Sequence, residues 1–199
     1  MPYEYRNMTP DEREAVMRER RQRGYPWHVP PHPFRGPARY FLSAANYEHN
    51  EIMASAGRRT DFEARLLDAI GSIGADLYAW VILPNHYHLL AGLQSLDLAS
   101  AALKQLHGTT SRDWNMADGQ TGRRRVWFKF ADRVIRGDAG FYGALNYIHV
   151  NPVKHGYMAD VYDWPWSRVH HYMEEHGRDW LRQHWRSYPP GDFGRGWDD

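Results

Sequence analysis

Two histidines separated by one residue, His86 and His88, have the type and spacing to do chemistry. In a β-strand, side chains at positions i and i+2 point to the same face and lie about 7 Å apart. Two imidazoles placed in this way can bind one divalent cation. The chain has 12 His and no Cys, so the triplet also fits a pair of hydrogen-bonded histidines in a sheet. Without Cys, a metal site would need His, Asn, Gln or carboxylate ligands.

A tyrosine and an asparagine four residues apart, Tyr147 and Asn151, form the second group. They fall near the end of a predicted helix, where positions i and i+4 lie one turn apart on one face. A phenol and an amide oxygen could therefore reach the same point above a sheet. The apolar stripe of this helix is expected at Phe141, Leu145 and Ile148, which leaves the pair on its flank. The same pattern fits a half-buried tyrosine bound to water or backbone, so the residues alone leave both interpretations open.

The elements that position these residues follow from hydrophobic periodicity. Strands are expected over 39–45, 77–83, 86–93 and 126–130, and helices over 61–73, 97–114 and 138–150. Pro84 argues against one uninterrupted strand from 77 to 93, and Pro152 is expected to end the last helix. This order predicts an α+β domain in which helices pack on a central antiparallel sheet.

The 199 residues suit one compact domain with extensions. We expect an N-terminal arm over 1–37, a domain over 38–185 and a tail over 186–199, with an arm helix over 10–23 capped by Thr9 or Asp11. The mean hydropathy of −0.76 and the 25% of charged residues argue against a membrane protein. The polar, acidic N-terminus argues against a signal peptide. Together with the absence of Cys, these features predict a cytoplasmic protein.

The net charge of +1 hides an uneven distribution. Residues 104–136 contain eight Lys and Arg against three Asp and Glu. Clustered cations of this kind are typical of surfaces that contact nucleic acid phosphates. A solvated loop is an equally good interpretation of any single arginine. The residues expected to hold a nucleic acid backbone are, in this segment, Arg123, Arg124, Arg125, Lys129, Arg133 and Arg136 and, farther along the chain, Lys154.

The motifs together resemble a known family. Residues 83–90, LPNHYHLL, followed by residues 147–156, YIHVNPVKHG, resemble the HUH single-tyrosine transposases, and in particular the REP-associated tyrosine transposases. The resemblance extends over roughly residues 38–185. It includes Trp127, the stretch 132–136 before the Tyr147 helix, and the stretch 163–167 after it. Trp164 and Trp166 of that stretch suit either base stacking or a core role, and we favour the core.

The resemblance implies an HUH endonuclease fold with a ferredoxin-like core, Tyr147 as the nucleophile, and His86 and His88 as ligands of Mg²⁺ or Mn²⁺. It implies Asn151, four residues after the tyrosine, as the third ligand, with His149 and His155 as alternatives. Attack on single-stranded or hairpin DNA would give a 5′-phosphotyrosine and a free 3′-hydroxyl. The same site could then rejoin strands without ATP. The implied enzyme is a metal-dependent single-stranded DNA nickase and strand transferase, a monomer or homodimer.

Two other functions remain open at this stage. One is a catalytically idle relative that binds hairpin DNA through its basic and aromatic surface. The other is a metallohydrolase in which the two histidines and a carboxylate such as Asp132 activate water. The first predicts salt-sensitive binding without cleavage, and the second predicts turnover without a covalent intermediate.

Overall fold

The computed structural model describes residues 9–12, 14–15, 18, 36–120, 122, 124–191 and 193–194. Contacts divide the chain into one unit of residues 35–195 and another of residues 1–34 with 196–199. In the second unit, the Thr9 hydroxyl accepts a hydrogen bond from the Glu12 backbone N–H, and the Glu12 carboxylate accepts one from the Thr9 backbone N–H. This is a capping box, so Thr9 rather than Asp11 caps the predicted helix. Residues 10–12, 14–15 and 18 are helical, and the other residues of that helix lie outside the described residues.

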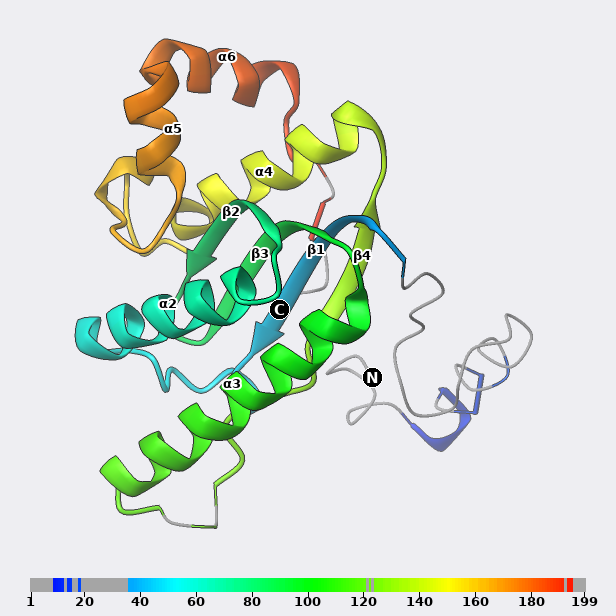
Figure 1. The fold of residues 1–199 in the computed structure, drawn as a ribbon, viewed down its shortest axis with the longest axis vertical. Coiled ribbons are helices and arrows are strands. Elements are labelled where there is room, and N and C mark those ends of the chain that lie inside the picture. The colour runs from blue at the N-terminus through cyan, green and yellow to red at the C-terminus, as the bar shows by residue number, and fades with distance from the viewer. Residues whose placement is uncertain are drawn as a thin grey trace. The chain divides into compact units, whose positions relative to one another are not determined.

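The unit of residues 35–195 is built on a four-stranded antiparallel sheet with the order β2-β3-β1-β4 (Figure 1). The strands are β1 (Ala38–Ala45), β2 (Asp76–Ile82), β3 (His86–Leu93) and β4 (Ala131–Ile135). The α-helices are α2 (Ala56–Gly71), α3 (Leu96–Ala117), α4 (Gly137–Lys154), α5 (Val169–His176) and α6 (Arg178–Ser187). Two short 3-10 helices are η2 (Tyr47–His49) and η3 (Val161–Asp163). The predicted α+β sheet with helices packed on it is confirmed.

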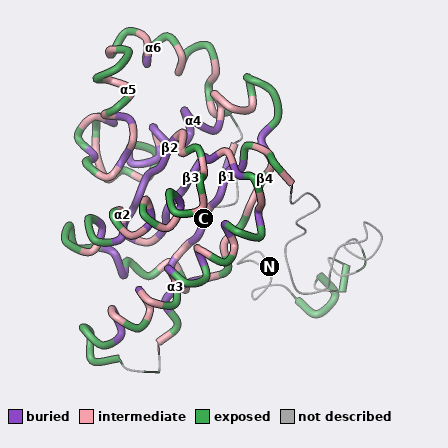
Figure 2. The backbone as a smooth tube through the Cα atoms, in the orientation of Figure 1, coloured by how far each residue is buried: buried purple, intermediate pink, exposed green. Residues whose placement is uncertain are grey.

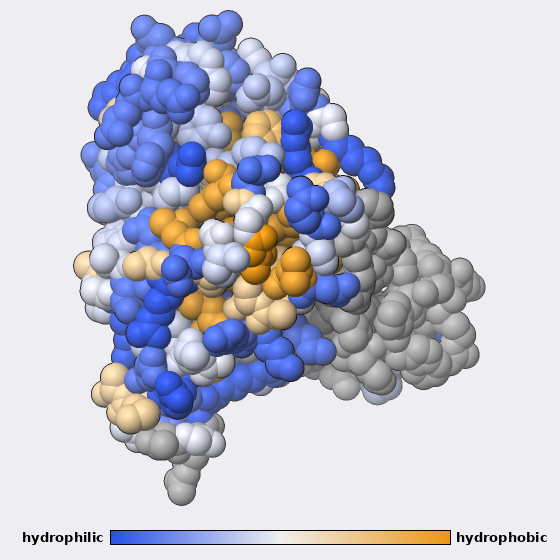
Figure 3. All heavy atoms as spheres, in the orientation of Figure 1, coloured by the Kyte–Doolittle hydropathy of each residue, from blue (hydrophilic) through white to orange (hydrophobic). Residues whose placement is uncertain are grey.

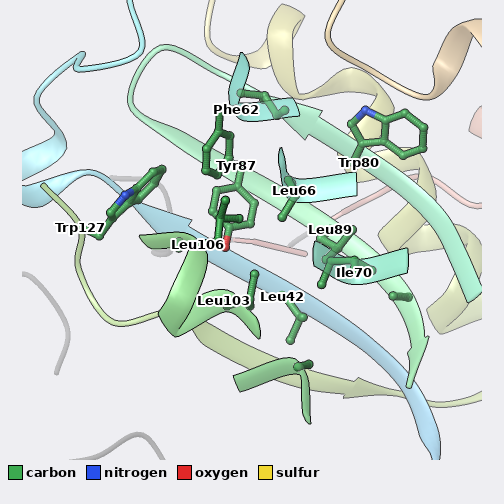
Figure 4. Packing of buried hydrophobic residues seen from close by; sticks show 14 of the residues in the cluster. Leu42, Phe62, Leu66, Ile70, Trp80, Tyr87, Leu89, Leu103, Leu106 and Trp127 are labelled. Atoms are coloured by element: carbon green, nitrogen blue, oxygen red, sulfur yellow. The ribbon is translucent and has the colours of Figure 1, made fainter. Parts of the chain in front are cut away.

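Alternation along the strands gives the sheet two different faces. Leu42 of β1 and Tyr87 and Leu89 of β3 point to the face that α2 and α3 cover, where they pack with Phe62 and Leu66 of α2 (Figure 4). All five side chains are fully buried. Each contributes about 1.5–3 kcal/mol through removal of apolar surface from water. This core fixes β3, and so fixes the residues of β3 that point to the opposite face.

Helix α4 lies on that opposite face and is buried on nearly all sides between Ala144 and Pro152 (Figure 2). Segments from the C-terminal part of the chain pack on its outer side. The Asn146 amide donates hydrogen bonds to the carbonyl oxygens of His184 and Tyr188, at 3.0 and 2.8 Å. Leu145 and Ile148 of the expected stripe are buried, but Tyr147, expected on the flank beside that stripe, is buried as well. Because α5 and α6, which the periodicity did not predict, supply the second wall, the helix has no solvated flank there.

The last turn of α4 runs past Pro152, where the helix was expected to end. His155 is its C-cap, and Gly156 follows with φ 72°. The Gly156 N–H donates to the Val153 carbonyl, and the Tyr157 N–H donates to the Pro152 carbonyl. This pattern is a Schellman motif, in which a glycine in the left-handed region closes the helix. The extra turn keeps Lys154 inside the helix.

The strand expected over 126–130 also differs from the structure. These residues run beside the end of β1, with a single bridge between Asn46 and Trp127 and a hydrogen bond from the Phe128 N–H to the Ala45 carbonyl. The regular strand, β4, begins at Ala131. At η2, Glu48 and His49 have positive φ, and this turn takes the residues that follow β1 out of the sheet. The pairing with residues 126–130 therefore ends there. The predicted break at Pro84 is confirmed, since β2 ends at Ile82 and β3 begins at His86.

The outer surface of α5 and α6 is mostly hydrophilic, whereas hydrophobic residues gather in the middle of the face that Figure 3 shows. Among the described residues, Leu98 and Met116 are the large hydrophobic side chains with more than half of their surface exposed, at 52% and 63%. None of the helices in the described part of the chain is long and apolar enough to cross a bilayer.

Candidate active site

His86 and His88 lie at the start of β3 and point to the face that α4 covers. In the antiparallel pairing with β1, His88 is opposite Ser43 and His86 is opposite Ala45. Both imidazoles are buried, and their ring centroids are 4.9 Å apart. The two-residue period of the strand therefore brings the pair together on one face, as a shared ligand would require.

Asn85 decides which nitrogen of His86 carries the proton. The Asn85 amide nitrogen donates to the carbonyl oxygen of His49 at 3.3 Å, so its Oδ1 faces His86 Nδ1, at 2.7 Å. Because an amide oxygen only accepts, Nδ1 is the donor and Nε2 keeps its lone pair. That Nε2 lies 3.3 Å from Oδ1 of Asn151. Two acceptor atoms that face each other are well placed to bind a cation between them.

The residues present fit a divalent metal. Two imidazole nitrogens and the Asn151 oxygen would leave coordination positions open for water or phosphate oxygens. Asn151 is fully buried, and its Nδ2 makes no hydrogen bond within the described residues. Nitrogen ligands favour Mn²⁺ over Mg²⁺, which prefers oxygen ligands. The described part of the chain holds no cluster of three His, Cys, Asp or Glu placed for a metal, which favours the Asn151 amide over a third imidazole as the third ligand.

Burial lowers the pKa of His86 well below its usual value, and the nearby His88 and His155 lower it further. His86 is therefore neutral at pH 7, which is the form that binds metal ions. The ring of His155 lies 5.0 Å from that of His86, so His155 remains an alternative third ligand. His149 is no longer an alternative ligand, because it is buried on the other side of α4, where its ring lies 5.2 Å from that of Tyr172 of α5.

Tyr147 lies between α4 and the sheet, with 2% of its surface exposed. Its ring centroid is 5.3 Å from that of His88 and 5.9 Å from that of Phe41. The Lys154 ammonium donates a hydrogen bond of 3.1 Å to the Tyr147 hydroxyl. The helix repeat explains this contact, because residues seven apart lie two turns along the same face. The sequence contained this signal, but the expected end of the helix at Pro152 hid it.

The C-terminal segment also reaches Tyr147, which no local pattern indicated. The Phe193 ring lies 5.3 Å from the Tyr147 ring and 5.0 Å from the Phe41 ring. A Cβ on Gly194 would overlap the ring of Tyr147, so only glycine fits there. The expected boundary between domain and tail, at residue 185, falls inside α6, and residues 193–194 pack on the site.

Two of the expected DNA contacts lie beside Tyr147. Lys154 binds its hydroxyl, and Arg133 of the edge strand β4 lies opposite Phe41, with its guanidinium carbon 5.6 Å from the centre of the Phe193 ring. Lys129 and Arg136 are exposed. Lys129 and Arg136 are therefore accessible to a ligand at this edge of the sheet.

Two of the arginines that precede them, Arg124 and Arg125, have protein partners. Arg124 donates to Asp118 at 2.7 Å and to Asn115 at 2.9 Å, both at the end of α3. Arg124 and Asp118 line a pocket of about 670 Å³ at the start of α2. Arg125 lies over the rings of Tyr47 and Phe128. Arg123 lies outside the described residues.

The carboxylate considered for a metallohydrolase points away from the histidines. Asp132 pairs with Leu42, and residues directly opposite each other in a sheet share a face. It therefore lies on the α2 and α3 side, where its charge helps to raise the pKa of Tyr40, after burial as the main cause. The metallohydrolase alternative therefore loses Asp132 as its third metal ligand. The core role favoured for Trp164 agrees with its position, because the side chain is 3% exposed and its indole N–H donates to the Ile82 carbonyl.

The comparisons with known proteins point to one family. Over 100 residues the chain is 31% identical to the REP-associated tyrosine transposase of Escherichia coli K12, a match that covers 48% of this chain and 54% of that protein. Over 111 residues it is 34% identical to a Haemophilus influenzae KW20 protein that carries the name "Putative REP-associated tyrosine transposase", a match that covers 50% of this chain and 62% of that protein. The chain thus spans between half and two thirds of these curated relatives. No protein-family model matches.

The fold gives the same result. A solved REP-associated tyrosine transposase, bound to a REP hairpin, superimposes with a TM-score of 0.57 over 72% of this chain and 83% of that one, at 22% sequence identity. The shared architecture is the antiparallel sheet with helices around it. The resemblance expected from the two motifs is therefore confirmed: this chain is similar in sequence to REP-associated tyrosine transposases and has their HUH-type fold.

Proposed function

We propose that the protein is a metal-dependent nickase and strand transferase that acts on single-stranded DNA beside hairpins, with Tyr147 as its nucleophile. The observation that carries the proposal is that Tyr147 contacts His88 while His86 faces Asn151, all within one buried cluster between β3 and α4. Similarity to REP-associated tyrosine transposases supports the reaction class. The hairpin in the solved relative supports the substrate.

The chemistry starts at the Tyr147 hydroxyl. A phenol has a pKa near 10 and is a weak nucleophile at neutral pH unless a cation stabilises its ionised form. The Lys154 ammonium, 3.1 Å away, supplies that charge. The phenol oxygen loses its proton and bonds to phosphorus, the bond from phosphorus to the 3′ oxygen breaks, and the 3′ oxygen takes up a proton. The products are a 5′-phosphotyrosine and a free 3′-hydroxyl, and the reverse step joins another strand.

His86, His88 and Asn151 would hold Mn²⁺ or Mg²⁺, with His155 as the other source of a third ligand. A bound divalent cation would offset the charge that develops on the phosphate oxygens. The protein's part is to keep His86 neutral through burial and to orient its ring through Asn85. The cations Arg133, Lys129 and Arg136 would hold the flanking backbone, as point charges and hydrogen-bond donors.

One observation favours the idle DNA-binding alternative. Tyr147 is 2% exposed, and Phe193 and Gly194 lie on its ring, so a phosphate cannot reach the hydroxyl without movement of that segment. Under the nickase proposal the segment moves when DNA binds. Under the alternative it stays, and the protein binds hairpins without cleavage.

The test is covalent adduct formation on a denaturing gel. Purified protein is incubated with labelled hairpin DNA from the flanks of its own gene, with Mn²⁺ or with EDTA. We expect a metal-dependent adduct that Tyr147→Phe and His88→Ala abolish. Tyr142→Phe is the matched control, because Tyr142 lies on the same helix and makes its ring contacts with Tyr188 and His184. An adduct that persists in Tyr147→Phe contradicts the proposal, and binding with no adduct supports the idle alternative.

A further inference from the structure

Ser43 of β1 carries a hydroxyl on the face of the sheet that holds the two histidines. Its neighbours Leu42 and Ala44 belong to the core on the α2 and α3 side, so Ser43 points to the opposite face, on which α4 lies. In the pairing of β1 with β3, Ser43 is directly opposite His88. Side chains that face each other in this way have Cβ atoms about 5 Å apart. The hydroxyl is therefore adjacent to the proposed metal ligands.

Two ring contacts place Ser43 relative to Tyr147. The Tyr147 ring lies 5.3 Å from the ring of His88, the residue opposite Ser43 in the sheet. It lies 5.9 Å from the ring of Phe41, which is two residues earlier in β1 and shares the same face. Ser43 thus occupies the corner between the two side chains that the Tyr147 ring contacts. A phosphate that reaches the phenol oxygen above this corner comes close to the serine.

The Ser43 side chain is accessible and keeps its hydrogen-bonding capacity. The residue is half-buried, and its hydroxyl makes no hydrogen bond to any other residue that the structure describes. On the same face, its neighbour Ala131 of β4 is exposed, and Ala45, opposite His86, is half-buried. Because these neighbours are small and solvent reaches them, this part of the sheet has room for a phosphate beside the histidines.

We propose that the Ser43 hydroxyl donates a hydrogen bond to a non-bridging oxygen of the scissile phosphate and is a catalytic residue of the reaction. The inference rests on the proposed function and adds a group to it. As the phenol oxygen bonds to phosphorus and the 3′ oxygen leaves, negative charge is spread over the non-bridging oxygens. A donor that a strand already holds in place stabilises this charge without reorganisation.

The positions of Ser43 and the histidines give the two non-bridging oxygens different partners. His86 and His88 belong to β3 and Ser43 to β1, so they would meet the phosphate from adjacent strands. One oxygen would face the cation that the histidines hold, and the other would face the serine hydroxyl. Sulfur can replace each oxygen separately, which gives two phosphorothioate diastereomers. The arrangement therefore predicts that only one of them depends on Ser43.

The experiment measures the single-turnover rate of adduct formation on hairpin DNA with Mn²⁺. Ser43→Ala should lower this rate by about tenfold or more, as expected for the loss of a hydrogen bond to a charged group. Ser43→Thr keeps the hydroxyl and should retain most of the rate. Ser43→Val has the shape of the threonine variant without its hydroxyl, and should be as slow as Ser43→Ala. Ser72→Ala is the control, because it removes an exposed hydroxyl that bonds to the Ala69 carbonyl.

Phosphorothioate substrates separate a direct contact from a structural role. Sulfur is a weak hydrogen-bond acceptor, so the wild type should react more slowly with each diastereomer than with the normal phosphate. In Ser43→Ala, the effect of sulfur should largely disappear for one diastereomer, because the donor is already lost. For the other diastereomer it should stay as in the wild type. Mn²⁺ affinity and the hairpin dissociation constant, measured in parallel, should match the wild type.

Two results would overturn the inference while the proposed function stands. One is adduct formation by Ser43→Ala at the wild-type rate. The other is a slow Ser43→Ala that keeps the wild-type sulfur effect for both diastereomers, since the hydroxyl would then act without touching the phosphate. If the wild type itself forms no adduct, the proposed function fails, and this inference fails with it.

Discussion

The Lys154 ammonium donates a hydrogen bond to the hydroxyl of Tyr147 across two turns of α4. The contact depends on the end of the helix, because Pro152 removes one backbone donor there and the Schellman closure at Gly156 helps to keep the final turn. The same helix therefore positions both Tyr147, the nucleophile of the proposed reaction, and Lys154, the cation that binds its hydroxyl.

Removing the Lys154 charge should slow adduct formation. Two unit charges 3.1 Å apart interact by about 1.3 kcal/mol even in bulk water, which corresponds to roughly tenfold in rate. Lys154→Met is expected to reduce the single-turnover rate of adduct formation by at least about tenfold, and Lys154→Arg to restore part of it. The hairpin dissociation constant is measured in parallel. If Lys154→Met changes only that constant, Lys154 holds the backbone and does not act on Tyr147.

Asn85 should matter for metal affinity although it would not touch the metal. It fixes the tautomer that leaves Nε2 of His86 free to bind a cation. Loss of such a supporting hydrogen bond typically costs 10- to 100-fold in affinity. Asn85→Ala should weaken Mn²⁺ binding by about that factor in titration calorimetry. Asn50→Ala, which removes an exposed amide bound to the Tyr47 carbonyl, is the control and should bind Mn²⁺ like the wild type.

Two glycines of the α4 region should respond to alanine in opposite directions. Gly156 has φ 72°, where a Cβ costs about 1 kcal/mol, so Gly156→Ala should lower the free energy of unfolding by about that amount. Gly143 lies inside the helix, and a Cβ there would meet no atom within 4 Å. Gly143→Ala should therefore raise the free energy of unfolding by about 0.5–1 kcal/mol. Urea denaturation measures both, and equal effects would contradict the assigned closure.

Acid should destabilise the fold through His107. Burial lowers its pKa from 6.5 to about 4, and its ring stacks on Trp127 and pairs with the Tyr87 hydroxyl. Between these two pH values the unfolded chain binds the proton and the folded chain does not. The contribution of neutral His107 to the free energy of unfolding is therefore fully present above pH 6.5. It falls as the pH approaches 4, by at most about 1.4 kcal/mol per pH unit.

The measurement is the free energy of unfolding across that pH range for the wild type and for His107→Gln. Gln keeps a hydrogen-bond acceptor for Tyr87 and cannot titrate. The slope should be smaller in the variant. An unchanged slope would assign the acid sensitivity to other groups, among which His149, with its pKa lowered to about 3 by burial, acts in the same direction.

Local patterns in the sequence determined much of this protein. The two-residue period of a strand put His86 and His88 on one face, and Pro84 separated β2 from β3. The order of apolar periods gave the α+β sheet, and the two motifs together gave the family resemblance. These signals are reliable because strand period, helix repeat and proline geometry act over a few residues and need no distant partner.

The tertiary structure decided what those residues touch. Whether Tyr147 is buried depends on α6, which holds Asn146, and on Phe193, which comes from the far end of the chain. The orientation of His86 depends on a hydrogen bond from Asn85 to His49. The register of β4 places Asp132 on the face of the sheet opposite to the two histidines. Such contacts join segments that are distant in sequence. They are fixed by packing of the whole domain, so no period or motif within one segment could reveal them.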